Sequence, residues 1–202
     1  MQFLFASQNK GKIAESEQIF SSTKHQLLSL NDHQQLINIG VKIPAGLIVN
    51  ELGKTLQENA LIKAQAFNQL TKLPCIADDS GLFLAALPDF PGVNSNRWFK
   101  GDDRKRNLAL LKKIENKSNR QAKFQTILCL YGFNNKKPLF FLGEVQGQIA
   151  CKIQGNGGFA YDPIFIPDDY QLSFAQLGPA IKNKISHRAK AWRKLVSYLE
   201  KN

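Results

Sequence analysis

The sequence predicts an α/β fold built on a mixed β-sheet, and three observations support this class. Strand-like and helical segments alternate along the first half of the chain, which is typical of strands linked through helices. Two strand-like segments in the second half are separated by a short turn, which is typical of an antiparallel pair. The 202 residues, 43% of them hydrophobic and 21% charged, fit one large domain or one bilobed unit better than two independent domains.

The chain begins with a strand, a polar loop and a helix. We expect the strand at Gln2–Ala6 and the helix at about Ile13–Phe20, with the loop Ser7–Lys12 between them. Such a loop brings backbone N–H groups, the positive end of a helix and two lysines to one point, which suits a phosphate group. It lacks the glycine spacing of a P-loop, so the motif alone does not identify a nucleotide site. The next stretch, Lys24–Val49, is expected to hold a strand and loops.

A longer helix is predicted over Thr55–Leu70. Its first residue and Glu58 have the spacing of a capping box, and apolar residues recur behind them at helical intervals. Asn59 and Lys63 are four residues apart and therefore share one face of this helix, while Glu51 lies in the preceding loop. The plain alternative is that these are ordinary surface side chains.

The tetrad Asp78-Asp79-Ser80-Gly81 carries the main chemical signal. It follows the apolar run Pro74–Ala77, so we expect a buried strand that ends in a glycine turn with two adjacent carboxylates. Neighbouring anions repel each other, and they invite a divalent cation or a cluster of basic side chains. The alternative interpretation is a solvated turn, since all four residue types favour turns.

A second long helix is expected after an ordered loop at Asn94–Trp98, with Asp102 or Asp103 as its cap. An apolar strand at Phe124–Phe133 then pairs through a turn at Asn134-Asn135 with a strand at Leu139–Val145.

The last third of the chain is punctuated by glycines. A turn at Gln146-Gly147 is expected to lead into a strand at Gln148–Ile153. The glycines of Gly155–Gly158 then precede the aromatic segment Phe159–Phe165. Glycines allow a backbone to approach a ligand closely, and aromatic rings stack on bases. A plain loop before a buried strand would give the same pattern.

The final helix has an unusual first turn. Ser186 is a credible N-cap, and His187 and Arg188 follow it. Cations are unfavourable near the positive end of a helix, so these two residues indicate a purpose other than helix stability. Lys182 lies shortly before them.

Composition restricts the class of partner. The net charge of +11 favours anionic partners, but no basic run is interleaved with aromatic residues and no nucleic-acid module is present, so no stable nucleic-acid partner is expected. No apolar stretch approaches about 18 residues, so we expect a soluble, cytoplasmic protein without a membrane span. Cys75, Cys129 and Cys151 are widely spaced in apolar runs, which predicts reduced core residues.

Taken together, the segments resemble one known family from end to end, the ITPase-like (HAM1/RdgB-type) pyrophosphatases that act on inosine and xanthosine triphosphates. Six ordered motifs match across nearly the whole chain. They are Ser7-Gln8-Asn9-Lys10-Gly11-Lys12, Glu51 with Thr55, Asn59-Ala60 and Lys63-Ala64, Ala77-Asp78-Asp79-Ser80-Gly81-Leu82, Pro91-Gly92-Val93 with Ser95 and Arg97, Gly158-Phe159-Ala160-Tyr161-Asp162-Pro163-Ile164-Phe165, and Ser186-His187-Arg188.

The resemblance implies an elongated mixed sheet flanked by helices, one bilobed domain over residues 1–202 with a central cleft, and a homodimer. It implies hydrolysis of a purine nucleoside triphosphate such as ITP, dITP or XTP to the monophosphate and pyrophosphate, with Mg²⁺ as cofactor. The nearer rival is a related pyrophosphatase with a different base preference, and the more distant one is a noncatalytic nucleotide or nucleic-acid binder.

The resemblance also implies roles for individual residues. By position, Asp79 is similar to the catalytic carboxylate and metal ligand, with Glu51 and Asp78 as further ligands of Mg²⁺ or its waters. Lys63 joins Asp79 and Glu51 in the catalytic set. The residues implied to hold the triphosphate are Ser7, Gln8, Asn9, Lys10, Gly11, Lys12, Lys63 and Ser80.

Base choice follows from hydrogen-bond donors. Lys182, His187 or Arg188 directed at O6 and N7 would accept hypoxanthine, whereas the amino group of adenine would set donor against donor. Guanine also has O6, so its exclusion needs a further feature. Phe159 is implied to stack on the base, and Ala160, Tyr161 and Asp162 are implied to line its pocket.

Two positions depart from the family pattern. Ala160 stands where a second glycine is usual, and it would be strained if its backbone needs a positive φ. Asn96 stands where an alanine is usual, which bears on the loop that carries Arg97.

Overall fold

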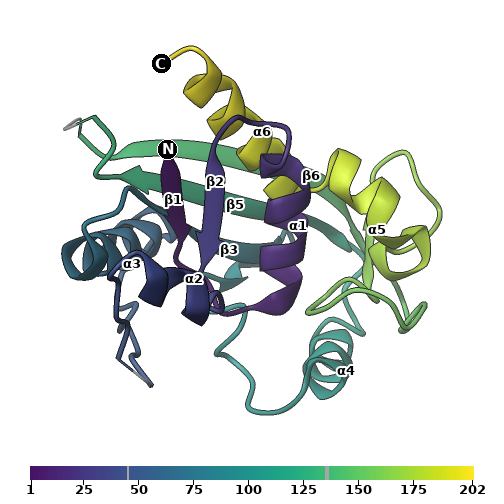
Figure 1. Ribbon diagram of the computed structural model, residues 1–202. Helices are drawn as coiled ribbons and strands as arrows, with labels where there is room; N and C mark the ends of the chain where they lie inside the picture. Colours follow the sequence, from purple (N-terminus) through teal and green to yellow (C-terminus); the bar gives the residue numbers. More distant parts are fainter. Residues whose placement is uncertain (45, 135–136) are drawn as a thin grey trace. The chain divides into compact units, whose positions relative to one another are not determined.

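The computed structural model describes residues 1–44, 46–134 and 137–202, and it has a mixed β-sheet with helices (Figure 1). Seven strands pair in the order β2-β1-β3-β5-β6-β7, with β4 added to β3. The strands are β1 (Gln2–Phe5), β2 (Gln26–Ser29), β3 (Cys75–Leu84), β4 (Leu87–Gly92), β5 (Gln121–Tyr131), β6 (Leu139–Ile149) and β7 (Phe165–Pro167). The helices are α1 (Lys10–Phe20), α2 (His33–Asn38), α3 (Leu56–Thr71), α4 (Asp103–Lys113), α5 (Phe174–Ile185) and α6 (His187–Glu200).

Strand directions confirm the predicted mixed sheet. β1 runs parallel to both β2 and β3, whereas β4 is antiparallel to β3 and β7 is antiparallel to β6. The parallel strands are joined through helices, as the alternation of segments predicts, whereas the antiparallel strands β3 and β4 are joined by a short connection and β6 and β7 by the longer segment between Ile149 and Phe165.

The chain forms two compact units. Unit 1 comprises Met1–Asp79, Thr126–Leu142 and Ala191–Asn202, and unit 2 comprises Ser80–Gln125 and Gly143–Lys190. The chain passes from unit 1 to unit 2 along β3, between Asp79 and Ser80.

Unit 1 is built on β1, which is buried on both faces. Phe3 and Phe5 pack with α1 and α6, where the ring centroids of Phe5 and Trp192 lie 5.3 Å apart. Leu4 points to the other face and packs with Ala60 and other residues of α3. Side chains alternate between the faces of a strand, so a continuous apolar run is what a strand covered on both sides requires.

Unit 2 has its own core around β5, β7 and α5. The rings of Phe124 and Phe165 lie 4.7 Å apart, and the ring of Phe165 stacks on Phe174 at 5.4 Å. Leu110 on α4 is fully buried in the same cluster. This core supports the segment that follows the glycine-rich loop.

Two predicted turns are wrong for the same reason. The tetrad Asp78-Asp79-Ser80-Gly81 lies inside β3, and Gln146-Gly147 lies inside β6. A Cβ at Gly81 would lie 2.5 Å from the carbonyl oxygen of Gly92 on β4, and a Cβ at Gly147 would collide with the backbone of Ile166 on β7. These glycines therefore permit close approach of a neighbouring strand and do not form turns.

Several helix signals are confirmed. Thr55 and Glu58 form a complete capping box on α3, and the Asp102 side chain caps α4 by accepting from the Lys105 N–H at 2.7 Å. The Ser186 hydroxyl accepts from the Ala189 N–H at 3.2 Å at the start of α6. α1 begins three residues earlier than expected, at Lys10, because Asn9 is its N-cap.

Other expectations were incomplete. The helix α2 was not predicted within Lys24–Val49, and the turn at Asn134-Asn135 reaches beyond the described residues. Cys75 and Cys129 are free and buried, but Cys151 is exposed and so is not the core residue that its apolar neighbours predicted. In the described part of the chain, no helix is long and apolar enough to cross a membrane.

Candidate active site

In unit 1, the adjacent carboxylates of β3 face different helices. Asp78 forms an ion pair with Lys12 on α1, with Nζ and Oδ2 2.8 Å apart. Asp79 instead accepts a hydrogen bond from the Asn59 amide on α3 at 3.1 Å. Side chains alternate between the two faces of a strand, so Asp78 lies on the same face as Ile76, toward α1, and Asp79 lies on the same face as Ala77, toward α3. Both carboxylates are buried, with 1% and 8% of their surface exposed.

Lys63 connects the acidic groups on the α3 side. Its Nζ lies 3.0 Å from Oε1 of Glu51 and donates to the backbone carbonyl of Asp78 at 2.9 Å. Burial would lower the pKa of Lys63, but the charges of Asp78, Glu51 and Asp79 outweigh burial and raise it. Lys63 is therefore a fixed cation, suited to contact phosphate oxygens.

Asn59 holds Asp79 in place through both ends of its own amide. Its carbonyl accepts from the Gly53 N–H at 2.8 Å, so its NH₂ group is directed at Asp79. Gly53 has to be glycine here, since a Cβ would lie 2.7 Å from the Asn59 oxygen. The capping box that starts α3 immediately precedes Asn59 and fixes this geometry.

The pKa of Asp79 is raised to about 6. Burial is the main cause, and the positive charges of Lys63 and Lys12 and the Asn59 hydrogen bond counteract it only in part. Asp79 thus lies in an environment that favours added positive charge, as expected for a carboxylate that assists a reaction near neutral pH.

The segment Ser7–Lys12 lies partly in a helix and not wholly in a loop. The Asn9 side chain accepts from the Lys12 N–H at 3.0 Å and caps α1, so Lys10, Gly11 and Lys12 form its first turn. Gln8 and Lys10 are exposed and Ser7 is buried. The positive N-terminus of α1 and the Lys12 side chain, which is paired with Asp78, thus lie in the same turn of the helix.

The chemistry of the carboxylates fits a hard cation. Carboxylate oxygens are the donors that Mg²⁺ prefers, and burial of Asp79 makes its anion one that a cation would stabilise. Within residues 1–44, 46–134 and 137–202, however, no three His, Cys, Asp or Glu side chains form a group that could hold a metal ion. Two of the three expected ligands, Asp78 and Glu51, are paired with lysines instead.

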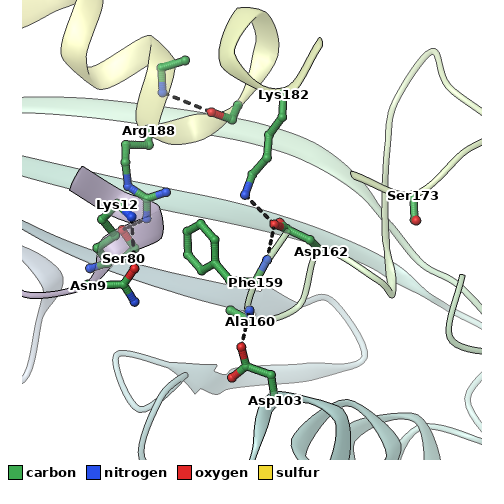
Figure 2. Close-up of polar contacts among 12 residues, drawn as sticks. Asn9, Lys12, Ser80, Asp103, Phe159, Ala160, Asp162, Ser173, Lys182 and Arg188 are labelled. Carbon is green, nitrogen blue, oxygen red and sulfur yellow. Dashed lines mark hydrogen bonds and ion pairs between the residues drawn. The ribbon is translucent and has the colours of Figure 1, made fainter. Parts of the chain in front are cut away.

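In unit 2, cationic side chains surround the Phe159 ring (Figure 2). Lys182 Nζ lies 4.2 Å from the ring centroid and the Arg188 guanidinium carbon 5.5 Å from it. Arg188 also donates to the Ser80 hydroxyl at 3.5 Å. Lys182 and Arg188 are almost completely buried, while Phe159 is half-buried.

Asp162 organises this cluster. Its Oδ2 is 2.5 Å from Lys182 Nζ, and the same oxygen accepts from the Phe159 N–H at 2.9 Å. Gly158 has a φ of 73°, and a Cβ there would collide with the Asp162 carboxylate. One buried carboxylate therefore fixes both the aromatic residue and the cation beside it.

His187 and Tyr161 are anchored in the core of unit 2. The His187 ring stacks on Phe124 with centroids 4.7 Å apart. The Tyr161 hydroxyl donates to the Ser95 carbonyl at 2.6 Å and lies 2.6 Å from the Trp98 indole nitrogen. Burial is the main cause that raises the pKa of Tyr161 to about 12, so this hydroxyl remains a donor.

The sequence singled out Asp103 only as a possible helix cap and did not point to Asn107, yet both residues of α4 contact Ala160. Asp103 accepts from the Ala160 N–H at 2.7 Å, and Asn107 donates to the Ala160 carbonyl at 2.9 Å. They lie more than fifty residues from Ala160 along the chain, and nothing in their local pattern connects them to it. Ala160 has a φ of 52°. This is the positive value that would explain why glycine is usual at this position.

Comparisons with known proteins agree with these observations. Residues 3–198 match the model of the Ham1 family. A dITP/XTP pyrophosphatase of Aquifex aeolicus is 37% identical over 99% of this chain and 97% of its own length, and one of Flavobacterium psychrophilum is 40% identical over 99% and 100%.

Solved structures give the same result. A HAM1 protein from Coxiella burnetii has a TM-score of 0.85 and 34% identity, with all of both chains covered. A Nucleoside-triphosphatase / dITP/XTP pyrophosphatase from Mycobacterium abscessus has a TM-score of 0.73 and 35% identity over 97% of this chain and 99% of its own. With an acidic strand matched to lysines in unit 1, an aromatic ring among cations in unit 2, and likeness over the full length, the chain belongs to the Ham1 family.

Proposed function

We propose that this protein hydrolyses purine nucleoside triphosphates that carry hypoxanthine or xanthine, namely ITP, dITP and XTP, to the monophosphate and pyrophosphate. The observation that carries the proposal is the buried carboxylate of Asp79, held by Asn59 beside Lys63. The relatives' names, dITP/XTP pyrophosphatase, support the same reaction. The enzyme is thus a diphosphate-releasing hydrolase that acts on a phosphoric anhydride.

Each charged group of unit 1 has a role in the proposed reaction. Water forms a bond to the α-phosphorus, the bond from that phosphorus to the bridging oxygen breaks, and pyrophosphate leaves with the electron pair. Asp79 orders the attacking water and takes up its proton, as a carboxylate held in place by Asn59 can do. Lys63, Lys12 and the first turn of α1 neutralise the phosphate oxygens.

Mg²⁺ is the cofactor that we propose for this site. When bound, it would neutralise charge on the triphosphate and on the leaving pyrophosphate. Asp79 and Glu51 would hold it, because both lie on the α3 side with Lys63. Asp78 would contribute only after release from Lys12.

Unit 2 supplies the groups that we assign to the base. Phe159 offers a half-buried ring for stacking, and Lys182 and Arg188 offer donors beside it. These donors can donate to the O6 and N7 atoms of hypoxanthine and xanthine, whereas the 6-amino group of adenine is itself a donor and cannot pair with them. His187 is packed on Phe124, so we propose that it stabilises the start of α6 in addition to any contact that it makes with the base.

The test is pyrophosphate release from ITP, dITP, XTP, GTP, ATP and TTP, with Mg²⁺ and with EDTA. The proposal expects Mg²⁺-dependent release from the first three alone. Preference for a standard base would instead indicate a related pyrophosphatase, and binding without any release would indicate a noncatalytic nucleotide binder.

We also propose that the two units form one bilobed domain and that the protein is a cytoplasmic homodimer. These proposals rest on the resemblance in sequence. Light scattering of the purified protein tests the dimer, and a monomer at micromolar concentration would contradict it.

A further inference from the structure

Helix α4 holds Ala160 at both of its backbone polar groups. Asp103 Oδ2 accepts the Ala160 N–H at 2.7 Å, and Asn107 Nδ2 donates to the Ala160 carbonyl at 2.9 Å. The two side chains are four residues apart and therefore share one face of α4. Figure 2 shows Asp103 directed at Ala160, next to Phe159. We call Asp103 and Asn107 the α4 clamp.

The backbone that the clamp holds is an unusual one. Ala160 has a φ of 52°, a conformation that residues with a Cβ seldom adopt. Without external contacts, this residue would tend to relax to negative φ. Because Phe159 is its immediate neighbour in the chain, such a change would alter the backbone next to the ring that lies beside Lys182 and Arg188.

Asn107 is an improbable choice for stability alone. Only 1% of its surface is exposed, and its Oδ1 has no hydrogen-bond partner among the described residues. A buried carbonyl without a partner is unfavourable, and leucine at this position would avoid that penalty. The bond to Ala160 is thus the evident reason for an asparagine.

The rest of the segment is fixed independently of the clamp. The Phe159 N–H is held by Asp162, and the Tyr161 hydroxyl is held between Ser95 and Trp98. Ala160 is the position between these anchors whose backbone direction depends on α4.

We propose that Asp103 and Asn107 are positioning residues that set affinity and selectivity for the base by holding Ala160, and with it Phe159, in the binding conformation. This inference rests on the proposed function. The clamp would act on base recognition in unit 2 and leave the phosphate chemistry of unit 1 unchanged.

The experiment uses Asn107→Leu, Asp103→Ala and Asp103→Asn in the full-length protein. The readouts are the Kd values for IMP and for pyrophosphate, and kcat and KM for ITP and ATP. One net hydrogen bond corresponds to up to about a tenfold change. Asn107→Leu and Asp103→Ala should therefore raise the Kd for IMP and the KM for ITP by up to about tenfold, with kcat within about twofold and the Kd for pyrophosphate unchanged.

Two variants separate positioning from stability. Asp103→Asn loses the ion pair with Arg106 but keeps an oxygen for the Ala160 N–H, so it should restore affinity. Ala160→Gly adopts the positive φ without help, so adding it to Asp103→Ala should recover most of the lost affinity. Asp102→Ala is the matched control, because it removes the N-cap of α4 and keeps both clamp side chains.

Each outcome decides the question. The clamp is refuted if its variants bind IMP as the wild type does, if affinity for pyrophosphate falls in parallel, or if Asp102→Ala gives the same loss. A wild type without preference for ITP over ATP refutes the proposed function, and the clamp falls with it. A selective wild type whose clamp variants stay selective refutes the clamp alone.

Discussion

The charged cluster of unit 1 and the aromatic cluster of unit 2 combine the same types of charged residue in opposite proportions. Unit 1 sets three carboxylates, Glu51, Asp78 and Asp79, against Lys12 and Lys63. Unit 2 sets one carboxylate, Asp162, against Lys182 and Arg188 around an aromatic ring. The first cluster has an excess of negative charge and the second an excess of positive charge.

The difference in charge indicates what each cluster lacks. An acidic excess repels a triphosphate, so the proposed function requires an added cation in unit 1. A cationic excess beside an aromatic ring needs a flat ligand with acceptor atoms, which a 6-oxopurine supplies. In the proposed function, the same residue types serve phosphate chemistry in one unit and base recognition in the other.

The largest effect is expected at Asp79. Asp79→Asn keeps the shape and still accepts from Asn59, but it cannot take up a proton. Turnover of ITP should fall by about 100- to 10,000-fold, while the Kd for IMP changes little. Steady-state kinetics and calorimetry measure the two. The exposed carboxylate Asp168 provides the control, since Asp168→Asn should leave both unchanged.

The next largest effect is expected on stability in unit 2. Lys182→Met leaves the Asp162 carboxylate buried without its cation, which should lower the free energy of unfolding by about 3–5 kcal/mol. Urea unfolding measures this loss. Lys105→Met is the contrast, because its pair with Asp102 is largely exposed and should contribute less than about 1 kcal/mol. Equal losses in both variants would contradict the assignment.

A pH dependence of stability should distinguish unit 1. The pKa of Asp79 is about 6 in the folded protein and 3.8 ordinarily, so folding favours its neutral form. That stabilisation is complete below pH 3.8 and is lost as pH rises through 6, by about 3 kcal/mol in total. Asp79→Asn should therefore become the more stable protein above pH 6.

The measurement is urea unfolding of both proteins in EDTA from pH 4 to 8. The wild type should lose stability relative to Asp79→Asn across this range. A constant difference would mean that Asp79 is ionised throughout, and the proposed proton acceptor would then need another identity.

Local signals in the sequence predict the structure where one short segment determines the outcome. The capping box at Thr55 and the caps at Asp102 and Ser186 depend on neighbours three residues away, so their spacing predicts them. Asn59 and Lys63 were placed on one helix face near Glu51, and the structure connects Lys63 to Glu51 directly.

Features that depend on distant segments were missed. Gly81 and Gly147 looked like turn residues because the strands that approach them are remote in sequence. The sequence also grouped Asp78 with Asp79, whereas strand alternation directs them to different helices. The role of Asp103 and Asn107 depends on a loop more than fifty residues away.

The smallest expected effect concerns backbone strain at one position in each unit. Ala160 in unit 2 and Lys72, the C-cap of α3 in unit 1, both have positive φ, at 52° and 60°. An L residue in this region is disfavoured by about 1–2 kcal/mol, while glycine loses about 0.5–1 kcal/mol through the greater freedom of the unfolded chain. Ala160→Gly and Lys72→Gly should each stabilise the protein by about 0.5–1 kcal/mol in thermal unfolding.

Gly158→Ala should do the opposite, because it adds a Cβ at a φ of 73° against Asp162. If Ala160→Gly destabilises while Lys72→Gly stabilises, the Ala160 methyl group makes packing contacts that outweigh its strain, and the substitution for glycine at this position is then an adaptation of the base pocket.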